Sequence, residues 1–515
     1  NAGENFNIGS EATAATSGIH VDTFAGTVDV DVQKGVYMNV NSDNLIGATE
    51  SGHININAKE DIVLNAESNR AGHAFNGQGY ITNRNNQYVT HNSNLVGING
   101  IKKSDVIIQT EGNIIFTGKD NSANNLMNIG IFATGTRKDV NFNRPVNNGD
   151  DENNRPYVDE DGYVKSDINN TLLKADKIDI TIGNNYGTAV GVLAQQSNNV
   201  FVNLESITGV DFVVNSVNGN SVALDTADGN INIKASNGSN LIKAIAKNSG
   251  LGIGIQTEPD TYYQYTYSNR VNVIAETSNN VIATTTAISN NGSDSIVTIQ
   301  ANKGTNYLKA NDSVAIDAND KSQTILTSLF GNNNIEAGEI YTAKESQLQY
   351  GTSYAVNALS GSSVDLAAGE QNYLLGAVYA NGTGTNVDVK GTEGSTATNV
   401  VRSYTEIAGA GDIDTTSAVI DGEETNKFKD KRFVSAVYAE DGANIALTGE
   451  NSIGTWADSK DANTLERTVW AYSSDDTIGS TINLTGAADI RTNNYELSPK
   501  SADVAVAAGT ATGLT

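Results

Sequence analysis

Residues 377–391 read AVYANGTGTNVDVKG, and residues 436–449 read AVYAEDGANIALTG. Each stretch starts with four residues that are mostly small or apolar, continues through a turn of Gly, Asn or Asp, and ends in a segment where alternate residues are apolar. Period-two alternation places neighbouring side chains on opposite faces of a strand. Each stretch therefore predicts a strand, a turn and a second strand.

Related stretches recur along the chain. The full pattern is visible as AVNALSGSSVDLAAG (355–369), VWAYSSDDTIGSTINLTG (469–486) and GVLAQQSNNVFVNLES (191–206), and its second half as GHININAKEDIVLNAE (52–67), DVIIQTEGNIIFTG (105–118) and DGNINIKAS (228–236). The long gap before the copy at 436 indicates skipped degenerate copies or an inserted loop. Strand-only repeats of about 20 to 30 residues predict a solenoid, in which each unit buries its apolar face by stacking on its neighbours. A propeller blade would need about 40 to 50 residues per repeat.

The length of the chain agrees with a solenoid. Its 515 residues exceed the roughly 250 to 300 at which one compact core stops growing, but the core of a solenoid lengthens without thickening. No Pro-rich or charge-rich linker divides the sequence, and no long stretch has apolar residues at helical spacing. We therefore expect one elongated all-β domain over residues 1–515, with candidate loop insertions at residues 136–170, 256–270 and 402–433.

The charge of the chain is strongly acidic. Lys and Arg number 32 against 59 Asp and Glu, which gives a formal net charge of −27. Nucleic acids, heparin-like polymers and anionic membranes bind basic surfaces. The composition therefore argues against these partners and favours a solubilising surface, with calcium binding as an alternative use of the carboxylates.

The chain has no cysteine. An exported chain that crosses an oxidising compartment while unfolded would be trapped by a disulfide, so the absence favours export. The first residues, NAGENFNIGS, contain neither a basic segment nor an apolar one, and no stretch reaches the roughly 18 consecutive apolar residues of a membrane helix. We expect a mature or trimmed fragment of a longer protein.

These features together resemble a known family. The AVYA phrase, the run NIALTGENSIGT (444–455), the lack of Cys, the scarcity of Pro and the acidic, Asn/Thr/Gly-rich composition are similar to passenger domains of monomeric bacterial autotransporters of the type V secretion pathway, in the adhesin and self-associating branch. The resemblance covers most of the chain and is best from about residue 355 onward. It implies a right-handed parallel β-helix, export through a C-terminal outer-membrane β-barrel to which the native chain continues, and display at the bacterial cell surface.

Motifs for catalysis are not evident in the sequence. The serine-protease members of the family carry a GDSGS-type motif, and neither this string nor a GxSxG elbow nor a GDSL pattern occurs here. The four histidines, His20, His53, His73 and His91, form no close metal-binding pair, and we expect them on the surface or in loops. We therefore predict a protein without enzymatic activity. A β-helical polysaccharide-cleaving enzyme, which would use grouped carboxylates, is the alternative from another class.

An acidic segment lies inside the first candidate insertion. NNGDDENNRPYVDEDGYVKSD (147–167) is the densest group of carboxylates, which are Asp150, Asp151, Glu152, Asp159, Glu160 and Asp161. Its DEDG lacks the ligand spacing and the terminal Glu of an EF-hand. The segment predicts a solvated loop, with a cation site or an acidic contact surface as alternatives. We expect no cofactor, and calcium is the cation left open.

Binding residues usually lie on loops that interrupt a scaffold. The segment QTEPDTYYQYTYSNR (256–270) carries four tyrosines within six residues, namely Tyr262, Tyr263, Tyr265 and Tyr267. Tyrosine supplies large contact area with a polar tip and is enriched where interfaces draw their binding energy. Three of the four also alternate, as in a strand with an aromatic ladder, so both interpretations stay open.

The sequence as a whole predicts a surface-displayed adhesin of a diderm bacterium that contributes to biofilm. Its partners would be a host matrix protein, a cell-surface protein or glycan, or partner bacteria. Outward-facing Asn, Thr and Ser side chains also allow homotypic self-association between copies, which a net charge of −27 would oppose at low salt. A display stalk, with the active module elsewhere in the native protein, is a further alternative.

Overall fold

The computed structural model describes residues 4–16, 18–21, 26–41, 44–48, 52–68, 94–101, 104–120, 127–134, 169–195, 199–248, 250–258, 269–343, 347–407, 419–420, 423–424, 432–457, 464–473, 478–492 and 504–510. Over these residues the regular structure is β-strand, and no α-helix is present. The chain divides into two compact units. The first is Asn1–Ser236, Ile245–Gly250 and Thr257–Asn272, and the second is Asn237–Ala244, Leu251–Gln256 and Val273–Thr515.

Strands of the first unit stack in parallel in three columns. The first column is β3 (Thr27–Asp31), β6 (His53–Ala58), β9 (Asp105–Thr110), β12 (Asn169–Asn184), β14 (Val200–Ser216) and β16 (Asn230–Ala235). The second is β1 (Phe6–Ile8), β4 (Val36–Val40), β7 (Ile62–Ser68), β10 (Ile114–Asp120) and the second halves of β12 and β14. The third is β2 (Ile19–Val21), β5 (Asn44–Ala48), β8 (Asn94–Ile101), β11 (Met127–Thr134), β13 (Thr188–Gln195) and β15 (Ser221–Ala227).

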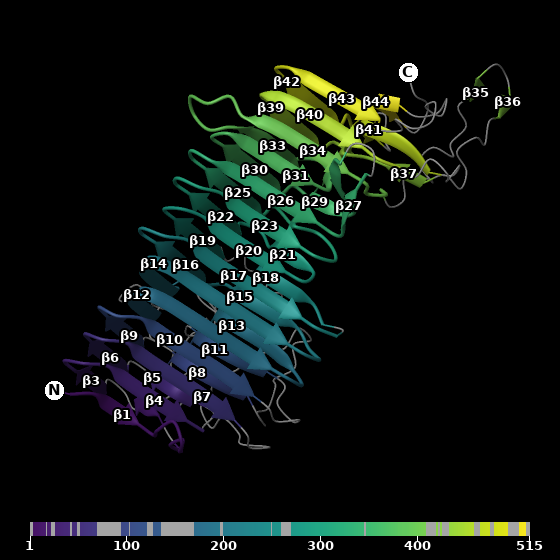
Figure 1. Cartoon of the computed structure of the whole chain (residues 1–515). Helices are drawn as coiled ribbons and strands as arrows, with labels where there is room; N and C mark the ends of the chain where they lie inside the picture. The colour runs from purple at the N-terminus through teal and green to yellow at the C-terminus, as the bar shows by residue number, and fades with distance from the viewer. Residues whose placement is uncertain are drawn as a thin grey trace, which may run out of the picture. The chain divides into compact units, whose positions relative to one another are not determined.

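The second unit repeats the three columns (Figure 1). The first is β22 (Ile296–Ala301), β25 (Gln323–Ser328), β30 (Ser363–Ala368), β33 (Asn386–Gly391), β39 (Asn444–Thr448) and β42 (Thr481–Thr485). The second is β20 (Asn279–Ala283), β23 (Asn306–Ala310), β26 (Asn332–Ala337), β31 (Gln371–Leu375), β34 (Thr398–Ser403), β40 (Glu450–Thr455) and β43 (Ala488–Thr492). The third is β21 (Thr286–Asn291), β24 (Ile316–Asn319), β29 (Tyr354–Leu359), β32 (Ala377–Asn381), β38 (Val437–Glu440), β41 (Thr464–Ser473) and β44 (Val504–Thr510).

The remaining strands lie outside these columns or carry residues of both units. β17 (Asn240–Ala246), β18 (Gly252–Thr257) and β19 (Arg270–Ala275) carry residues of both units. β27 (Ile340–Thr342) and β28 (Gln349–Gly351) pair antiparallel, as do β35 (Val419–Ile420) and β36 (Glu423–Glu424), and β37 (Arg432–Val434) runs parallel to β41. Three parallel strands per turn make a parallel β-helix. The predicted all-β solenoid is therefore confirmed, while the prediction of one domain over residues 1–515 stays a prediction.

The two stretches that predicted the fold lie on neighbouring turns of the coil. β32 and β33 form the first stretch, β38 and β39 form the second, and the register joins Val378 to Val437 and Val387 to Ile445. Because no turn separates them, skipped copies are the wrong explanation of the gap, and an insertion between β34 and β37 is the right one. The turn of the first stretch contains Gly382 at φ 95°, which lies in the left-handed region that glycine adopts readily.

The three predicted insertions lie between strands of the coil. Residues 136–170 start after β11 and reach into the first residues of β12, residues 256–270 join β18 to β19, and residues 402–433 join the end of β34 to β37. Within these segments the structure describes residues 169–170, 256–258, 269–270, 402–407, 419–420, 423–424 and 432–433.

The Ala-Val doublet of the opening phrase marks a tightly packed position. Corresponding residues in the third column are Gly130-Ile131 in β11 and Gly191-Val192 in β13, and both residues of each doublet are buried. A Cβ added to Gly130 would lie 2.6 Å from the carbonyl oxygen of Gly191 and 2.8 Å from the Ile182 side chain. The first residue of the doublet is small because the next strand and the core side chains approach it closely.

A ladder of buried asparagines runs through the second unit. Each of its amides donates from Nδ2 to the Oδ1 of the next at 2.9–3.0 Å, and the ladder is Asn240, Asn279, Asn306, Asn333, Asn372, Asn399 and Asn451. Asn306 also donates to the carbonyl oxygen of Thr327 at 2.9 Å. The amides are at most 3% exposed, so each must find its hydrogen bonds inside the protein. The expectation that asparagine faces outward is therefore wrong for this set.

Replacement of one ladder residue should destabilise the second unit. Asn306→Ala removes bonds to both neighbouring rungs and leaves buried polar atoms without partners, so we expect a loss of about 2 kcal/mol in the free energy of unfolding. Asn334→Ala is the matched control, because Asn334 is a partly exposed strand residue outside the ladder, and its effect should stay within about 0.5 kcal/mol. Urea unfolding measures both. Equal midpoints for the two variants would contradict the assigned role of the ladder.

Candidate functional site

The site residues predicted from sequence lie outside the described residues. These are Tyr262, Tyr263, Tyr265 and Tyr267 in the second insertion, and Asp150, Asp151, Glu152, Asp159, Glu160 and Asp161 in the first. Both groups stay predictions.

Two of the four histidines are described. His20 lies in β2 and His53 in β6, where its Nδ1 is 3.0 Å from the Oδ2 of Asp105 on β9. Both side chains are partly exposed. His73 and His91 lie outside the described residues, so a contact between His53 and His73 stays untested. Within the described ranges, no three His, Asp or Glu side chains group closely enough to hold a metal ion.

A row of tyrosine, amide and carboxylate side chains follows the third column of the second unit. We name the set Tyr354, Tyr379, Asn381 and Glu440 the tyrosine strip. The parallel register places Tyr379 of β32 opposite Tyr438 of β38, and Asn381 opposite Glu440. Tyr354, Tyr379, Asn381 and Glu440 are all partly exposed, whereas Tyr438 is fully buried. The strip is therefore a surface feature that adjoins a buried aromatic ring on the next strand.

The rings of the strip stack along the column. Tyr379 and Tyr438 are nearly parallel, with centroids 5.3 Å apart and planes at 7°, and Tyr354 meets Tyr379 at 5.6 Å and 37°. Offset-stacked aromatic pairs at such distances are favourable. The register of β32 and β38 produces the stack of Tyr379 on Tyr438, because residues at equal positions lie about 4.8 Å apart. Tyr354 pairs with Ala377 and reaches Tyr379 from two residues away.

Glu440 accepts hydrogen bonds from two other polar groups of the strip. Its Oε2 accepts hydrogen bonds from the Tyr379 hydroxyl at 2.5 Å and from Asn381 Nδ2 at 3.0 Å, and Asn381 Nδ2 also donates to the Tyr379 hydroxyl oxygen at 2.8 Å. Burial raises the pKa of the Glu440 carboxyl, and the hydrogen bond from Tyr379 offsets part of this rise. Burial likewise raises the pKa of the Tyr379 hydroxyl. The three groups form a fixed arrangement of donors and acceptors beside exposed ring surface.

A second carboxylate lies further along the same column. Asp317 of β24 accepts a hydrogen bond from Asn357 of β29 at 2.8 Å, and burial raises the pKa of its carboxyl. Asp317 lies three strands away from β38, the strand that carries Tyr438 and Glu440. Neighbouring strands are about 4.8 Å apart, so Asp317 and Glu440 are separated by at least about 14 Å. Paired carboxylates in glycoside hydrolysis stand about 5 to 9.5 Å apart. These two carboxylates therefore do not form such a pair.

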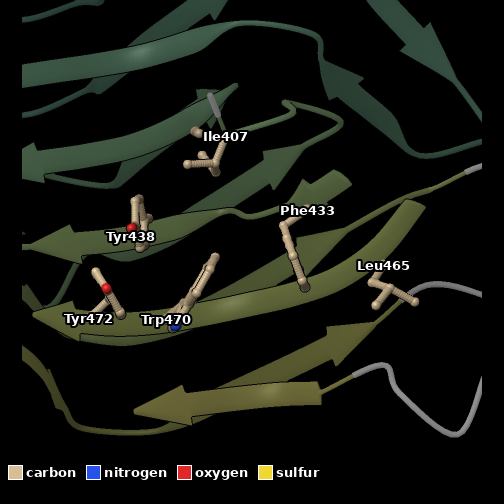
Figure 2. Close-up of a cluster of buried hydrophobic side chains, with 7 residues drawn as sticks. Ile407, Phe433, Tyr438, Leu465, Trp470 and Tyr472 are labelled. Carbon is tan, nitrogen blue, oxygen red and sulfur yellow. The ribbon is translucent and has the colours of Figure 1, made fainter. Parts of the chain in front are cut away.

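Buried aromatic side chains continue the column beside the strip. Figure 2 shows Tyr438, Trp470 and Phe433 of this cluster on neighbouring strands. The Trp470 ring lies 4.8 Å from Tyr438 and 5.4 Å from Phe433, and it is 1% exposed. Because these large side chains are buried, Tyr438 is fixed in place, and Tyr379 stacks against it with little freedom to move. A surface held in this way loses little conformational entropy on binding.

The repeated stretches contain Tyr379, Asn381 and Glu440 but were not predicted to form a site, and Tyr354 lies just before the stretch at 355–369. Tyr379 and Tyr438 are the third residues of the two AVYA phrases, and Glu440 follows the second phrase directly. The recurrence of tyrosine at one position of a repeat was the available signal. The hydrogen bond between Asn381 and Glu440 could not be predicted from the sequence, because it depends on which turns of the coil are neighbours.

Searches against protein family models, curated proteins and solved structures find no match for this chain. Among the described residues, no helix is long and apolar enough to cross a membrane. The interpretation of the site therefore depends on its geometry.

The raised pKa of Glu440 predicts a dependence of stability on pH. Because the folded state disfavours the ionised carboxyl, the contribution of Glu440 to stability is complete below its ordinary pKa of 4.5 and is lost as pH rises through the raised value. Glu440→Gln, which mimics the protonated form, should lose less stability than the wild type between pH 5 and pH 7. Thermal unfolding across this range measures the difference.

Glu276→Gln provides a control of opposite sign. Hydrogen bonds from Asn302 and Lys303 lower the pKa of Glu276, so its contribution is present above its ordinary pKa and is lost as pH falls. Parallel pH profiles for the wild type and Glu440→Gln would show that Glu440 does not titrate differently in the folded state.

Proposed function

We propose that this chain is a surface-displayed bacterial adhesin that attaches to host or partner-cell surfaces and contributes to biofilm. In this proposal the β-helix is a non-catalytic scaffold, and it is exported by the type V pathway. Its partners are a matrix protein, a cell-surface protein or glycan, or neighbouring bacteria.

The tyrosine strip is the observation that supports this proposal. Tyrosines with both an apolar face and a polar tip are favoured at binding surfaces, because they contribute contact area at low entropic cost. Here Tyr354 and Tyr379 are partly exposed, their rings are stacked on a rigid sheet, and Asn381 and Glu440 add polar groups at fixed positions. Sites on strands hold their side chains more accurately than sites on loops.

Homotypic self-association is a second candidate, supported by a row of amides in the first unit. Asn203, Asn232 and Asn272 each donate from Nδ2 to the preceding amide oxygen at 2.8–2.9 Å, starting from Asn170. Unlike the buried ladder of the second unit, these residues are partly exposed and alternate with buried neighbours. Regularly spaced amides offer weak polar contacts whose sum along two copies is adequate for association.

Substitution in the strip tests the adhesin. Tyr379→Ala removes ring area and the hydroxyl bound to Glu440, and we expect attachment of the purified chain to target cells or matrix to weaken at least about tenfold. Tyr307→Ala is the matched control, because Tyr307 is also partly exposed and its hydroxyl donates to a carboxylate, Glu336, at 2.9 Å. Attachment should survive this change.

The tyrosine segment of the second insertion is tested in the same assay. A variant with Tyr262, Tyr263, Tyr265 and Tyr267 all replaced by Ser, and still folded, identifies that segment as the binding surface if it loses attachment while Tyr379→Ala keeps it. That result would remove the tyrosine strip from the proposal. Absence of attachment by the wild type to every cell and matrix tested would contradict the adhesin itself.

Self-association should increase with ionic strength. Two copies with a net charge of −27 repel one another, and about 0.15 M salt shortens the range of that repulsion to about 8 Å. We therefore expect sedimentation velocity to show larger species as sodium chloride rises from about 10 mM to 150 mM. A monomer at every salt concentration would rule out the homotypic candidate, while association that weakens with salt would point to ion pairs in place of the amide row.

A further inference from the structure

Three aromatic side chains that do not belong to the tyrosine strip meet on the surface of the second unit. Tyr341 lies in β27, Tyr404 follows β34 and Trp456 follows β40. The rings of Tyr341 and Trp456 stack with centroids 4.3 Å apart, and Tyr404 meets the edge of Trp456 at 5.0 Å and 70°. All three are partly exposed, and we name them the aromatic platform.

Backbone pairing holds the platform in place. β27 and β28 form an antiparallel hairpin in which Tyr341 is opposite Tyr350, and Gly351 of β28 pairs in parallel with Ser403 of β34. The backbone N–H of Tyr404 donates to the carbonyl oxygen of Gly351 at 2.8 Å. β34 in turn pairs with β40, which leads into Trp456. Each of the three rings therefore lies in, or directly after, a strand that is hydrogen-bonded to a neighbouring strand.

Arg402 lies beside the platform. Arg402 precedes Tyr404 by two residues, which is about 7 Å along an extended chain. Residues two apart in an extended chain have their side chains on the same face, so Arg402 and Tyr404 share a face. Its guanidinium extends over the backbone of Gly454, where an added Cβ would lie 3.4 Å from Cδ and 3.6 Å from Nη1. Gly454 in turn precedes Trp456 by two residues. The positive charge and the aromatic rings therefore share one surface.

Within the described residues Arg402 forms no ion pair with a carboxylate, although the charge of Asp489 acts on it from the next strand but one. Nη1 donates to the carbonyl oxygens of Val401 at 3.1 Å and Ser452 at 2.6 Å, and Nη2 donates to Ser452 Oγ at 2.7 Å. All of these acceptors are neutral, and no described residue accepts a hydrogen bond from Nε. The carboxylate of Asp489 on β43 is held by Arg491, at 2.8 Å from Nε and 2.6 Å from Nη2.

The burial of the Arg402 guanidinium lowers the stability of the protein when no ligand is bound. Burial lowers the pKa of Arg402, although an arginine stays charged in proteins. Burying a charge without an opposite charge is unfavourable. Packing of the hairpin accounts for the contact of Tyr341 with Trp456, but it does not account for a partly buried arginine that forms no ion pair with any described carboxylate. A ligand that supplies a carboxylate would account for the position of Arg402.

We propose that the aromatic platform and Arg402 bind a sugar that carries a carboxylate. The apolar C–H face of the pyranose ring lies on the exposed ring surface of Trp456 and Tyr404, since aromatic rings offer a broad apolar contact. The carboxylate accepts hydrogen bonds from the free donors of Arg402, whose planar fork matches carboxylate geometry. This inference rests on the proposed adhesion and specifies the class of glycan that the surface recognises.

The experiment titrates the full chain with a uronic acid tetrasaccharide and with the same tetrasaccharide after reduction of its carboxyls to alcohols. Calorimetry gives Kd, and fluorescence reports the site directly. The chain has two tryptophans, so in a Trp470→Phe background Trp456 is the only tryptophan that emits. We expect the acidic sugar to bind and to shift the Trp456 emission, and the reduced sugar to bind at least tenfold more weakly.

Variants assign the binding to this surface. Arg402→Gln and Trp456→Ala should each raise Kd at least tenfold, whereas Arg432→Gln, which changes an arginine already paired with Glu406 at 2.8 Å, should leave it unchanged. If Arg402→Gln fails to fold, Arg402→Lys replaces it, because it keeps the charge and loses the planar fork. A sialylated trisaccharide in a parallel titration distinguishes sialic acid from uronic acid as the source of the carboxylate.

The proposal is overturned if neither acidic sugar binds at millimolar concentration, if the reduced sugar binds equally well, or if binding survives both Arg402→Gln and Trp456→Ala. Failure of the sugar site and failure of the adhesin remain distinguishable. Cell attachment without binding of any acidic sugar rejects the sugar site and retains the adhesin. Binding of the acidic sugar without cell attachment rejects the adhesin and retains the site.

Discussion

Parallel pairing in register is the constraint on which this structure depends. When strands stack in parallel at about 4.8 Å, a residue on one turn lies over its equivalent on the next. Any polar group that the coil buries must then find its partner on a neighbouring rung. The ladder from Asn240 to Asn451 satisfies this requirement, because each amide is both donor and acceptor and repeats at the same position.

The same register builds the surfaces. Tyr379 lies over Tyr438 for the reason that Asn306 lies over Asn333, and the difference is only which side of the strand each residue occupies. On the outer side a repeat need not be strict. Asn381 can therefore face Glu440, and one rung can present an arginine where its neighbour presents a glycine, as Arg402 and Gly454 do. Variation among the outward-facing residues places different functional groups on a scaffold whose inward-facing residues are nearly uniform.

Binding is the kind of function that such a surface performs well. The tyrosine strip and the aromatic platform both combine partly exposed rings with fixed polar groups, and both occur in the second unit. They differ in charge, since the strip carries the carboxylate of Glu440 and the platform carries the guanidinium of Arg402. One chain thus offers two chemically distinct surfaces, on a molecule whose overall charge is strongly negative.

The sequence alone determined the strand-turn-strand unit and the stacking of units into a solenoid. These follow from local alternation and turn residues, such as the valines of the DVDV-like runs and Gly382, which act within a few positions of the chain. Tertiary structure decided which turns are neighbours, and therefore that the phrases at 377 and 436 touch, that a set of asparagines is buried, and that Glu440 meets Tyr379. Those contacts join residues far apart in sequence, and their register is set by hydrogen bonding between strands, which no local pattern encodes.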